Sequence, residues 1–177
     1  MTPETLAYAM QCPITRAILW AAPITAAMDR YQISTPARQA AFLAQVGHES
    51  GRLVFVRELW NPAQFAWQAR YEGRADLGNT QPGDGAKFKG RGLIQITGRA
   101  NYKACGAALG LDLETSPALL EQSENAAMSA AWFWETHGCN ELADAGNFER
   151  ITRTINGGLN GQADRLALWD FAKRALA

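Results

Sequence analysis

Apolar residues recur at three- and four-residue spacings along most of this 177-residue chain, and helix start and stop signals separate the runs. Thr35-Pro36, Ser116-Pro117 and Asn147 are typical helix starts, and glycines follow several of the runs, as is typical of helix ends. Only residues 52–59 alternate, with enough β-branched residues for a short strand or an extended segment. The pattern therefore predicts a mainly α fold with a minor β element.

Helices are expected on both sides of one loop-rich segment. The second helix is expected to break or kink at Pro23, because proline removes a backbone donor. The expected helical ranges are 4–11, 13–30, 35–49, 61–71, 99–109, 116–122, 124–137, 147–155 and 163–176.

Residues 60–90 differ from the rest because glycine, proline, asparagine and aspartate follow one another closely between 73 and 85. Such a density predicts a long loop, and long loops in compact domains are usually functional or mobile. We therefore divide the chain into a body, residues 1–59 and 88–177, and a small lobe or lid, residues 60–87.

The net charge is zero, which argues against a generally basic nucleic-acid binder. Residues 50–103 nevertheless hold nine Lys and Arg against four Asp and Glu, whereas residues 104–149 hold eight acidic residues and no Lys or Arg. The two segments either pair with each other, which charge alone favours, or steer an anionic polymer to one face.

Cys12, Cys105 and Cys139 are too few for a disulfide framework, and no CxxC motif is present. With only two histidines in the chain, no metal site is expected, and the thiols are expected to be reduced and packed as small apolar groups.

The longest strongly apolar stretch, 17–28, is too short to span a bilayer, and the N-terminus has no signal-peptide pattern. We therefore expect no membrane insertion.

Two carboxylates could perform acid–base chemistry, since paired Asp or Glu residues carry out glycoside hydrolysis. Glu49 ends an apolar helix, where partial burial favours the protonated form that a general acid requires. Glu58 lies near Arg52 and Arg57, which would hold it ionised as a base. The simpler interpretation of the same two residues is a pair of surface glutamates.

Three glycines bracket the apolar run 90–98, in which Gln95 and Thr97 would share one face of an extended strand. They could bind a sugar or hold a water molecule, or they could be satisfied polar residues of a core strand. Neither a dinucleotide fingerprint nor a P-loop is present.

Other polar residues allow two interpretations each. Asn156 before Gly157 fits a helix cap, and Arg165 could be solvated or could hold a carboxylate. His48 precedes Glu49, but no HExxH motif follows, so a hydrogen-bonded support is favoured over a metal ligand. Trp60 and the aromatic residues that follow it could stack on sugars or could form the core of the small lobe.

Four sequence blocks, taken in order over roughly residues 35–170, resemble glycoside hydrolase family 19, which contains chitinases and lysozyme-type endolysins of bacteriophages. The blocks are Phe42-Leu43-Ala44-Gln45 with His48-Glu49-Ser50; Glu58; Gly90-Arg91-Gly92-Leu93-Ile94-Gln95-Ile96-Thr97-Gly98-Arg99-Ala100-Asn101-Tyr102; and Ile155-Asn156-Gly157-Gly158. The resemblance implies a lysozyme-like bilobal fold with a cleft between the lobes.

The resemblance also implies an inverting mechanism, with Glu49 as general acid, Glu58 as general base and Thr97 helping to hold the attacking water. Arg165 would support the acidic residues through its charge. The residues expected at the substrate are Gln95, Asn101, Asn156, Arg165, His48, Trp60 and Tyr102.

Departures from the plant enzymes favour the phage branch. The chain lacks their disulfides, the connection between the glutamates is short, Asn160 replaces an acidic residue, and Ala100 replaces a tyrosine. We therefore expect an endolysin that cleaves the β-1,4 bond between N-acetylmuramic acid and N-acetylglucosamine in peptidoglycan. It would be a monomer without cofactor or metal, would bind no nucleic acid, and would be held in the host cytoplasm until lysis. The alternatives are a chitinase, a lytic transglycosylase and a non-catalytic glycan-binding module.

Overall fold

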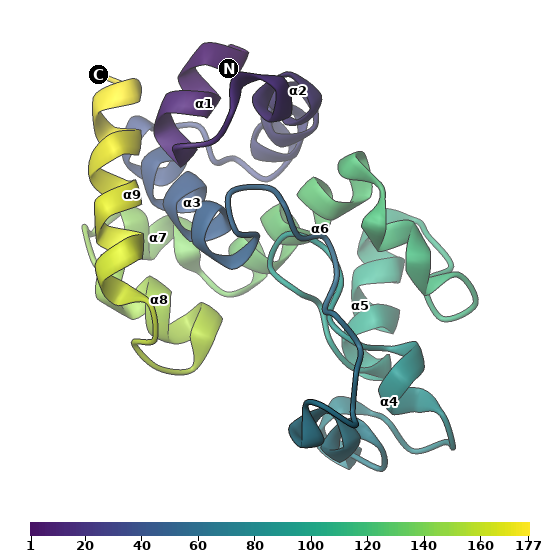
Figure 1. The fold of residues 1–177 in the computed structure, drawn as a ribbon. Helices are drawn as coiled ribbons and strands as arrows, with labels where there is room; N and C mark the ends of the chain where they lie inside the picture. Colours follow the sequence, from purple (N-terminus) through teal and green to yellow (C-terminus); the bar gives the residue numbers. More distant parts are fainter.

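The computed structural model describes residues 1–177 and has a large helical body with a smaller second lobe beside it (Figure 1). Helices α1–α3 and α7–α9 form the body, α4 and α5 lie on the other side, and α6 runs between the two groups. The second lobe thus includes α5 and is larger than the small lobe of residues 60–87. The predicted mainly α, bilobal fold is confirmed. No helix is long and apolar enough to cross a bilayer. The α-helices are α1 (Pro3–Met10), α2 (Ile14–Arg30), α3 (Pro36–Glu49), α4 (Asp84–Lys87), α5 (Arg99–Leu109), α6 (Ser123–Thr136), α7 (Cys139–Asp144), α8 (Phe148–Asn156) and α9 (Gln162–Ala175), and the 3₁₀ helices are η1 (Ala66–Tyr71), η2 (Ala75–Leu77) and η3 (Pro117–Glu121).

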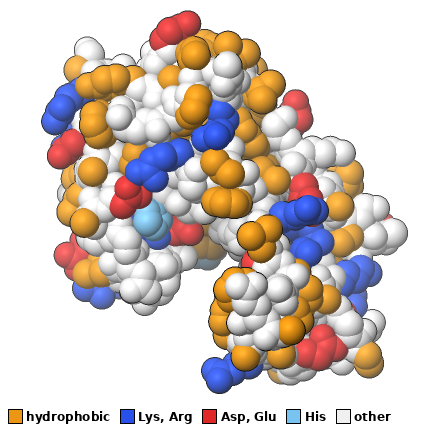
Figure 2. All heavy atoms as spheres, in the orientation of Figure 1, with side chains coloured by type: hydrophobic (Ala, Val, Ile, Leu, Met, Phe, Trp, Pro, Cys, Tyr) orange, Lys and Arg blue, Asp and Glu red, His pale blue; other side chains and the backbone are white.

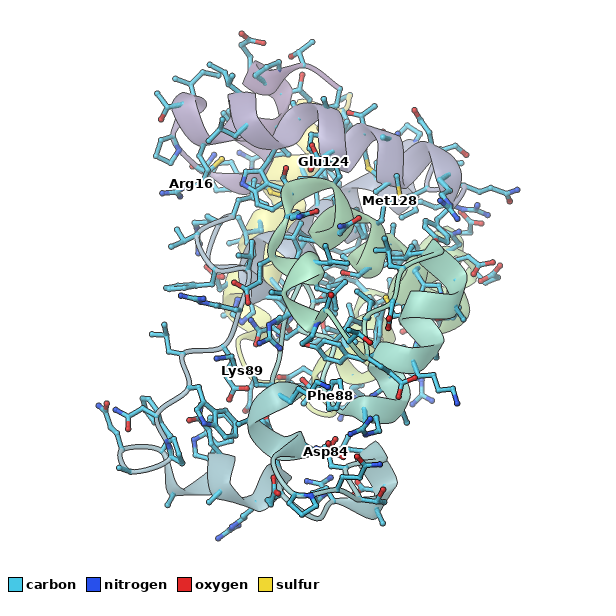
Figure 3. The ribbon with its side chains drawn as sticks, turned by 90° about the vertical axis from the view of Figure 1, so that its right-hand side faces the viewer. Arg16, Asp84, Phe88, Lys89, Glu124 and Met128 are labelled. Carbon is cyan, nitrogen blue, oxygen red and sulfur yellow. The ribbon has the colours of Figure 1, made fainter.

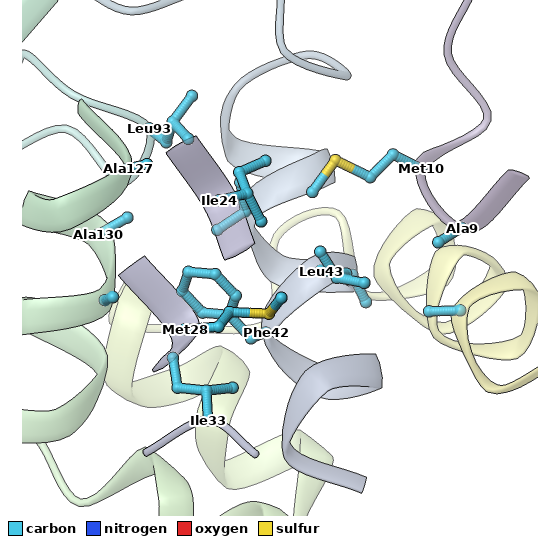
Figure 4. Close-up of a cluster of buried hydrophobic side chains, with 14 of the residues drawn as sticks. Ala9, Met10, Ile24, Met28, Ile33, Phe42, Leu43, Leu93, Ala127 and Ala130 are labelled. Carbon is cyan, nitrogen blue, oxygen red and sulfur yellow. The ribbon is translucent and has the colours of Figure 1, made fainter. Parts of the chain in front are cut away.

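Helix α3 lies at the centre of the body, and all its residues from Ala40 to Gly47 are buried. Thr35 caps its first turn by accepting a hydrogen bond from the Arg38 N–H at 3.2 Å. Phe42 and Leu43 lie among apolar side chains of neighbouring helices in a core cluster of 31 buried residues (Figure 4). Because α3 is enclosed in this way, Glu49 lies at the end of a firmly held helix.

A second, smaller apolar cluster lies between α5 and η3 and contains Phe88, Tyr102 and Cys105 among its six buried residues. Phe133 of α6 packs against both clusters and so connects the two lobes. Residues 60–87 contribute no side chain to either cluster. Figure 3 shows Asp84 in the lower lobe with Phe88 above it.

Of the two forms expected for residues 52–59, the strand is absent, because the chain turns sharply where that strand would begin. Gly51, Arg52 and Leu53 all have left-handed φ values, of 57°, 60° and 65°. The Ser50 hydroxyl holds this turn by accepting from the Leu53 N–H at 2.8 Å. Only an isolated antiparallel bridge between Arg57 and Arg91 remains of the expected β element on this side.

The run 90–98 is also a turn and not an extended strand. An isolated bridge joins Arg91 to Ile96, and Gln95 has a left-handed φ of 59°. The expected shared strand face of Gln95 and Thr97 is therefore wrong. Helix α2 continues unbroken through Pro23, and α7 was not anticipated.

Two other expectations are confirmed. All three cysteines are free and buried. The basic and acidic segments pair with each other, since Glu121 forms ion pairs with both Arg57 and Arg91, and Glu114 pairs with Arg99. Part of the charge asymmetry is thus used in ion pairs between the two segments.

Candidate active site

One open cavity of about 640 Å³ contains both candidate carboxylates, Glu49 from the end of α3 and Glu58 from the segment after the left-handed turn. The turn after α3 therefore brings Glu58 to the same cavity that Glu49 lines. A hollow lies between the body and the second lobe (Figure 2). The other residues lining the cavity are Phe55, Arg57, Leu59, Phe65, Trp67, Gln68, Tyr71, Gln95 and Asn156.

Glu49 is held by a buried arginine. Arg165, which is only 1% exposed, donates to Glu49 Oε1 at 2.5 Å and to Gln45 Oε1 at 2.5 Å. Gln45 in turn donates to the Thr152 hydroxyl at 2.8 Å. Arg165 therefore forms the ion pair with Glu49 that the expected charge support requires. Its expected contact with substrate is wrong, because its side chain is buried behind Glu49.

Glu58 is held by neutral donors and not by the arginines that the sequence suggested. Its Oε1 accepts from Gln68 Nε2 at 2.8 Å, and its Oε2 accepts from the Gly90 N–H at 3.2 Å. Arg57 pairs with Glu121, and Arg52 pairs with Asp164, so neither forms an ion pair with Glu58.

Gln95 joins the main cavity to a second one of about 190 Å³, because it lines both. The second cavity also contains Thr97, Asn101 and aromatic residues of α6. The Thr97 hydroxyl donates to the Gln95 carbonyl at 3.0 Å, and Asn101 Nδ2 donates to the Thr97 carbonyl at 2.7 Å. The structure thus places Thr97 in the adjoining cavity and not among the residues lining the cavity that holds Glu58.

Asn156 ends α8 but does not cap it, since the capping position is Gly157 with a left-handed φ of 75°. Its side-chain Nδ2 is buried and has no hydrogen-bond partner, although the residue lines the main cavity. An unpaired buried donor is costly unless a ligand or water satisfies it. The geometry therefore favours a binding role for Asn156 over capping.

His48 serves as a hydrogen-bonded support, as predicted. Its Nδ1 lies 2.7 Å from Asp164 Oδ2, and its ring packs so closely on Gly161 that a Cβ there would meet it at 2.2 Å. Burial raises the pKa of Asp164, but hydrogen bonds from His48 and Arg52 outweigh it and hold that pKa below its ordinary value.

The aromatic residues of the small lobe form a group beside Glu58. Trp60 stacks on Tyr71 with 6.0 Å between the ring centroids, and Trp67 packs edge-on against the same ring with 5.7 Å between the centroids. Trp67 and Tyr71 line the cavity, whereas Trp60 is not among its lining residues. The expected substrate contact of Tyr102 is wrong, because Tyr102 is fully buried and burial raises its pKa to about 12.

Sequence reasoning missed two glutamines, one behind each carboxylate. Gln45 acts on Glu49 through Arg165, and Gln68 contacts Glu58 directly. Both are almost fully buried. Gln45 could have been found as a polar residue within the apolar run of α3, while nothing in the local pattern marks Gln68. No group of three or more His, Cys, Asp or Glu side chains is placed to hold a metal.

Two carboxylates in one aromatic-lined cleft between helical lobes define an enzyme that cleaves glycosidic bonds. The sequence model of the family described as Chitinase class I matches residues 31–146, a stretch that includes both glutamates. The chain belongs to glycoside hydrolase family 19.

Relatives and solved structures agree with the family. A glycosyl hydrolase family 19 domain-containing protein of Haemophilus influenzae is 34% identical, over 82% of this chain and 84% of that protein. An Arabidopsis thaliana endochitinase is 36% identical over 73% of this chain, but the match covers only 43% of the plant protein. The crystal structure of a bacterial family 19 chitinase aligns with a TM-score of 0.78 and 28% identity, covering 99% of this chain and 94% of the other.

Proposed function

We propose that this chain hydrolyses the β-1,4 bond between N-acetylmuramic acid and N-acetylglucosamine in bacterial peptidoglycan, by an inverting acid–base mechanism. The observation that carries the proposal is the single cavity that Glu49 and Glu58 line from two different segments. The proposal includes an endolysin role, in which a monomeric enzyme accumulates in the host cytoplasm and reaches the wall at lysis.

In the proposed reaction, Glu49 gives its proton to the glycosidic oxygen as the bond from that oxygen to C1 breaks. A water oxygen attacks C1 from the opposite face, and Glu58 takes the proton that this water loses. Inversion requires the two carboxyl groups to be about 6.5–9.5 Å apart, which leaves room for the water. The hydroxyl of Thr97, which lines the adjoining cavity, would help to hold that water when a bound substrate occupies both cavities.

Other groups would bind the glycan and hold the acid. The unpaired Nδ2 of Asn156 and the amides of Gln95 and Asn101 are suited to acetamido and hydroxyl groups of sugars. Trp67 and Tyr71 offer aromatic faces for sugar rings. After Glu49 has lost its proton, the Arg165 guanidinium would stabilise the carboxylate that remains.

Charge beside the cavity supports an anionic glycan. Arg57 lines the cavity and stays largely exposed although it pairs with Glu121, and Lys89 lies near Glu58 without any ion-pair partner. Burial lowers the pKa of Lys89, and the positive charges of the neighbouring Arg91 and Arg57 lower it further. Peptidoglycan carries the carboxylates of its stem peptides, whereas chitin is neutral, so these cations favour the wall polymer.

Chitin is the second candidate substrate, and the names of the relatives favour it. The Arabidopsis relative is called an endochitinase, and the aligned crystal structure is described as a bacterial family 19 chitinase. A neutral chain of β-1,4-linked N-acetylglucosamine would use the same carboxylates and aromatic faces.

Purified Gram-negative sacculi and chitin hexasaccharide, digested side by side by the wild type and Glu49→Gln, separate these candidates. The proposal predicts soluble muropeptides with reducing muramic ends from the wild type and none from the variant. Cleavage of the hexasaccharide alone would select the chitinase, and anhydro-muramic ends would select a transglycosylase. Pelleting with sacculi without any product would select the binding module, and equal cleavage by Glu49→Gln would contradict the acid.

A further inference from the structure

Gln68 has a buried side-chain amide, and both of its polar atoms form hydrogen bonds. It is only 1% exposed, although it lies in η1, in a lobe made largely of turns. Its Oε1 accepts from the Asn61 N–H at 2.7 Å, and its Nε2 donates to the Leu59 carbonyl at 2.8 Å and to Glu58 Oε1 at 2.8 Å. The side chain therefore ties together the segment 58–61 that carries Glu58.

The orientation of this amide is fixed by its surroundings. If the amide flipped, its NH₂ group would face the Asn61 N–H, and its oxygen would face both the Leu59 carbonyl and Glu58. Two donors or two acceptors would then oppose each other in a buried place, which costs the hydrogen bonds and leaves groups unsatisfied. Nε2 is consequently directed at Glu58 whatever the state of the cavity.

We propose that Gln68 is a positioning residue that holds the Glu58 carboxylate in the orientation required to take a proton from water. The inference rests on the proposed function, because it presumes that Glu58 is the general base. Gln68 is the only side chain that donates a hydrogen bond to Glu58, and the other donor is the longer bond from the Gly90 N–H at 3.2 Å. Without Gln68, only the longer bond from the Gly90 N–H would limit rotation of the carboxylate about its side-chain bonds.

The neighbours of Gln68 give this role a connection to substrate. Trp67 and Tyr71, on either side of Gln68 in η1, line the same cavity as Glu58. A sugar ring stacked on them would hold η1 in place, and with it the amide that orients Glu58. The other ionisable groups facing this site are Tyr71, Arg57, Lys89 and, across the cavity, Glu49.

Gln68→Met tests the role because it keeps the size of the side chain and removes both hydrogen-bonding functions. On whichever of the sacculi and chitin hexasaccharide the wild type cleaves, we expect kcat to fall about 100-fold, the typical cost of a small misplacement of a catalytic group. KM should change little, because both polar atoms of Gln68 are already bonded to the segment 58–61 and offer no hydrogen bond to the glycan. Asn79→Ala is the matched control, since Asn79 is also a fully buried amide of this lobe but binds Tyr71 O and the Arg99 N–H instead of Glu58.

Gln68→Glu gives a second readout that a purely structural role would not change. It places a second carboxylate within hydrogen-bond distance of Glu58, and two adjacent carboxylates resist losing both protons. The acid limb of the kcat profile should therefore move to higher pH than in the wild type. In Asn79→Ala, the limb should stay where it is, even if the unfolding temperature falls.

The outcomes are distinguishable. Wild-type kcat in folded Gln68→Met, or an acid limb that does not move in Gln68→Glu, would overturn the positioning role while leaving the proposed function intact. A kcat loss in Gln68→Met no larger than that in Asn79→Ala would also overturn it, because lobe stability would then explain the loss. Undiminished turnover by Glu58→Gln would overturn the proposed function and the positioning role together.

Discussion

The helical body and the small lobe bury different kinds of side chain. The body contains a core of 31 buried apolar residues, those of α3 included, whereas residues 60–87 bury no large apolar side chain at all. The side chains that the small lobe buries are polar ones, namely Gln68, Asn79 and Asp84. One region is stabilised mainly by removing apolar area from water, and the other by matched hydrogen bonds and an ion pair.

This difference matches what each region contributes to the cleft. Apolar packing is non-directional and gives a firm platform for Glu49 at the end of α3. Hydrogen bonds are directional, so the polar core of the lobe can fix single groups such as Glu58 within a segment of turns. The polar core of the lobe is also more sensitive to mutation, because a buried polar group that loses its hydrogen-bond partner is strongly unfavourable.

Truncating the apolar core should have the largest effect on stability. Phe42 is fully buried and packs edge-on against Trp134, with 5.4 Å between the ring centroids. Phe42→Ala should lower the free energy of unfolding of the whole chain by about 3–5 kcal/mol, through lost burial and the cavity left behind. Urea denaturation followed by circular dichroism measures this loss, and a change below about 1 kcal/mol would contradict the assigned core.

Breaking the ion pair of the small lobe should have a smaller and more local effect. The Asp84 side chain is 2% exposed and accepts from Arg99 Nη2 at 2.5 Å and from the Gln81 N–H at 3.1 Å. Asp84→Asn should cost about 2–3 kcal/mol, because the charged hydrogen bonds are lost. Hydrogen exchange should speed up in residues 60–99 and stay unchanged in α3, whereas uniform acceleration would show that the two regions do not differ.

Acid should loosen the small lobe before the body. Hydrogen bonding from Arg99 holds the pKa of Asp84 below its ordinary value of 3.8. A lowered folded pKa contributes stability that is fully present above the unfolded pKa and is lost as the pH falls through the folded pKa. Below about pH 4, protease cleavage within 60–87 should therefore appear while the helical circular dichroism persists. Simultaneous loss of both signals would contradict this order.

The smallest effect is expected from an ion pair of the same kind on the surface of the same lobe. Arg74 and Asp76 also meet at 2.5 Å, but both side chains are substantially exposed. Solvent screens such a pair, so Arg74→Ala should leave the unfolding temperature unchanged within error. A loss as large as that of Asp84→Asn would show that contact geometry, and not burial, determines the strength of these pairs.

The helices of the body were predictable because their caps and apolar spacing are local signals. Thr35 caps α3 as expected, and α3 ends at Glu49 as the pattern indicated. The site was predictable in part, since Glu49 and Glu58 do share a cavity and Arg165 does hold Glu49.

The rest depended on tertiary structure that no local pattern carries. Alternation over 52–59 suggested a strand or an extended segment, but Arg52 and Leu53 are held in left-handed conformations by contacts around Ser50. Tyr102 belongs to a motif that suggested substrate contact, yet its ring is part of the second apolar cluster. A glutamine in a short helix beside a glycine-rich loop looks solvated in the sequence, so the buried position of Gln68 could not be foreseen.

The anomeric configuration of the first product tests the central claim most directly. Proton NMR recorded during the first minutes of digestion of whichever β-linked substrate the wild type cleaves would resolve the new reducing end before it mutarotates. Two carboxylates acting as separate acid and base, with water between them, predict the α-anomer. A β-anomer as the initial product would contradict this account, because it would require a covalent or substrate-assisted intermediate in place of direct attack by water.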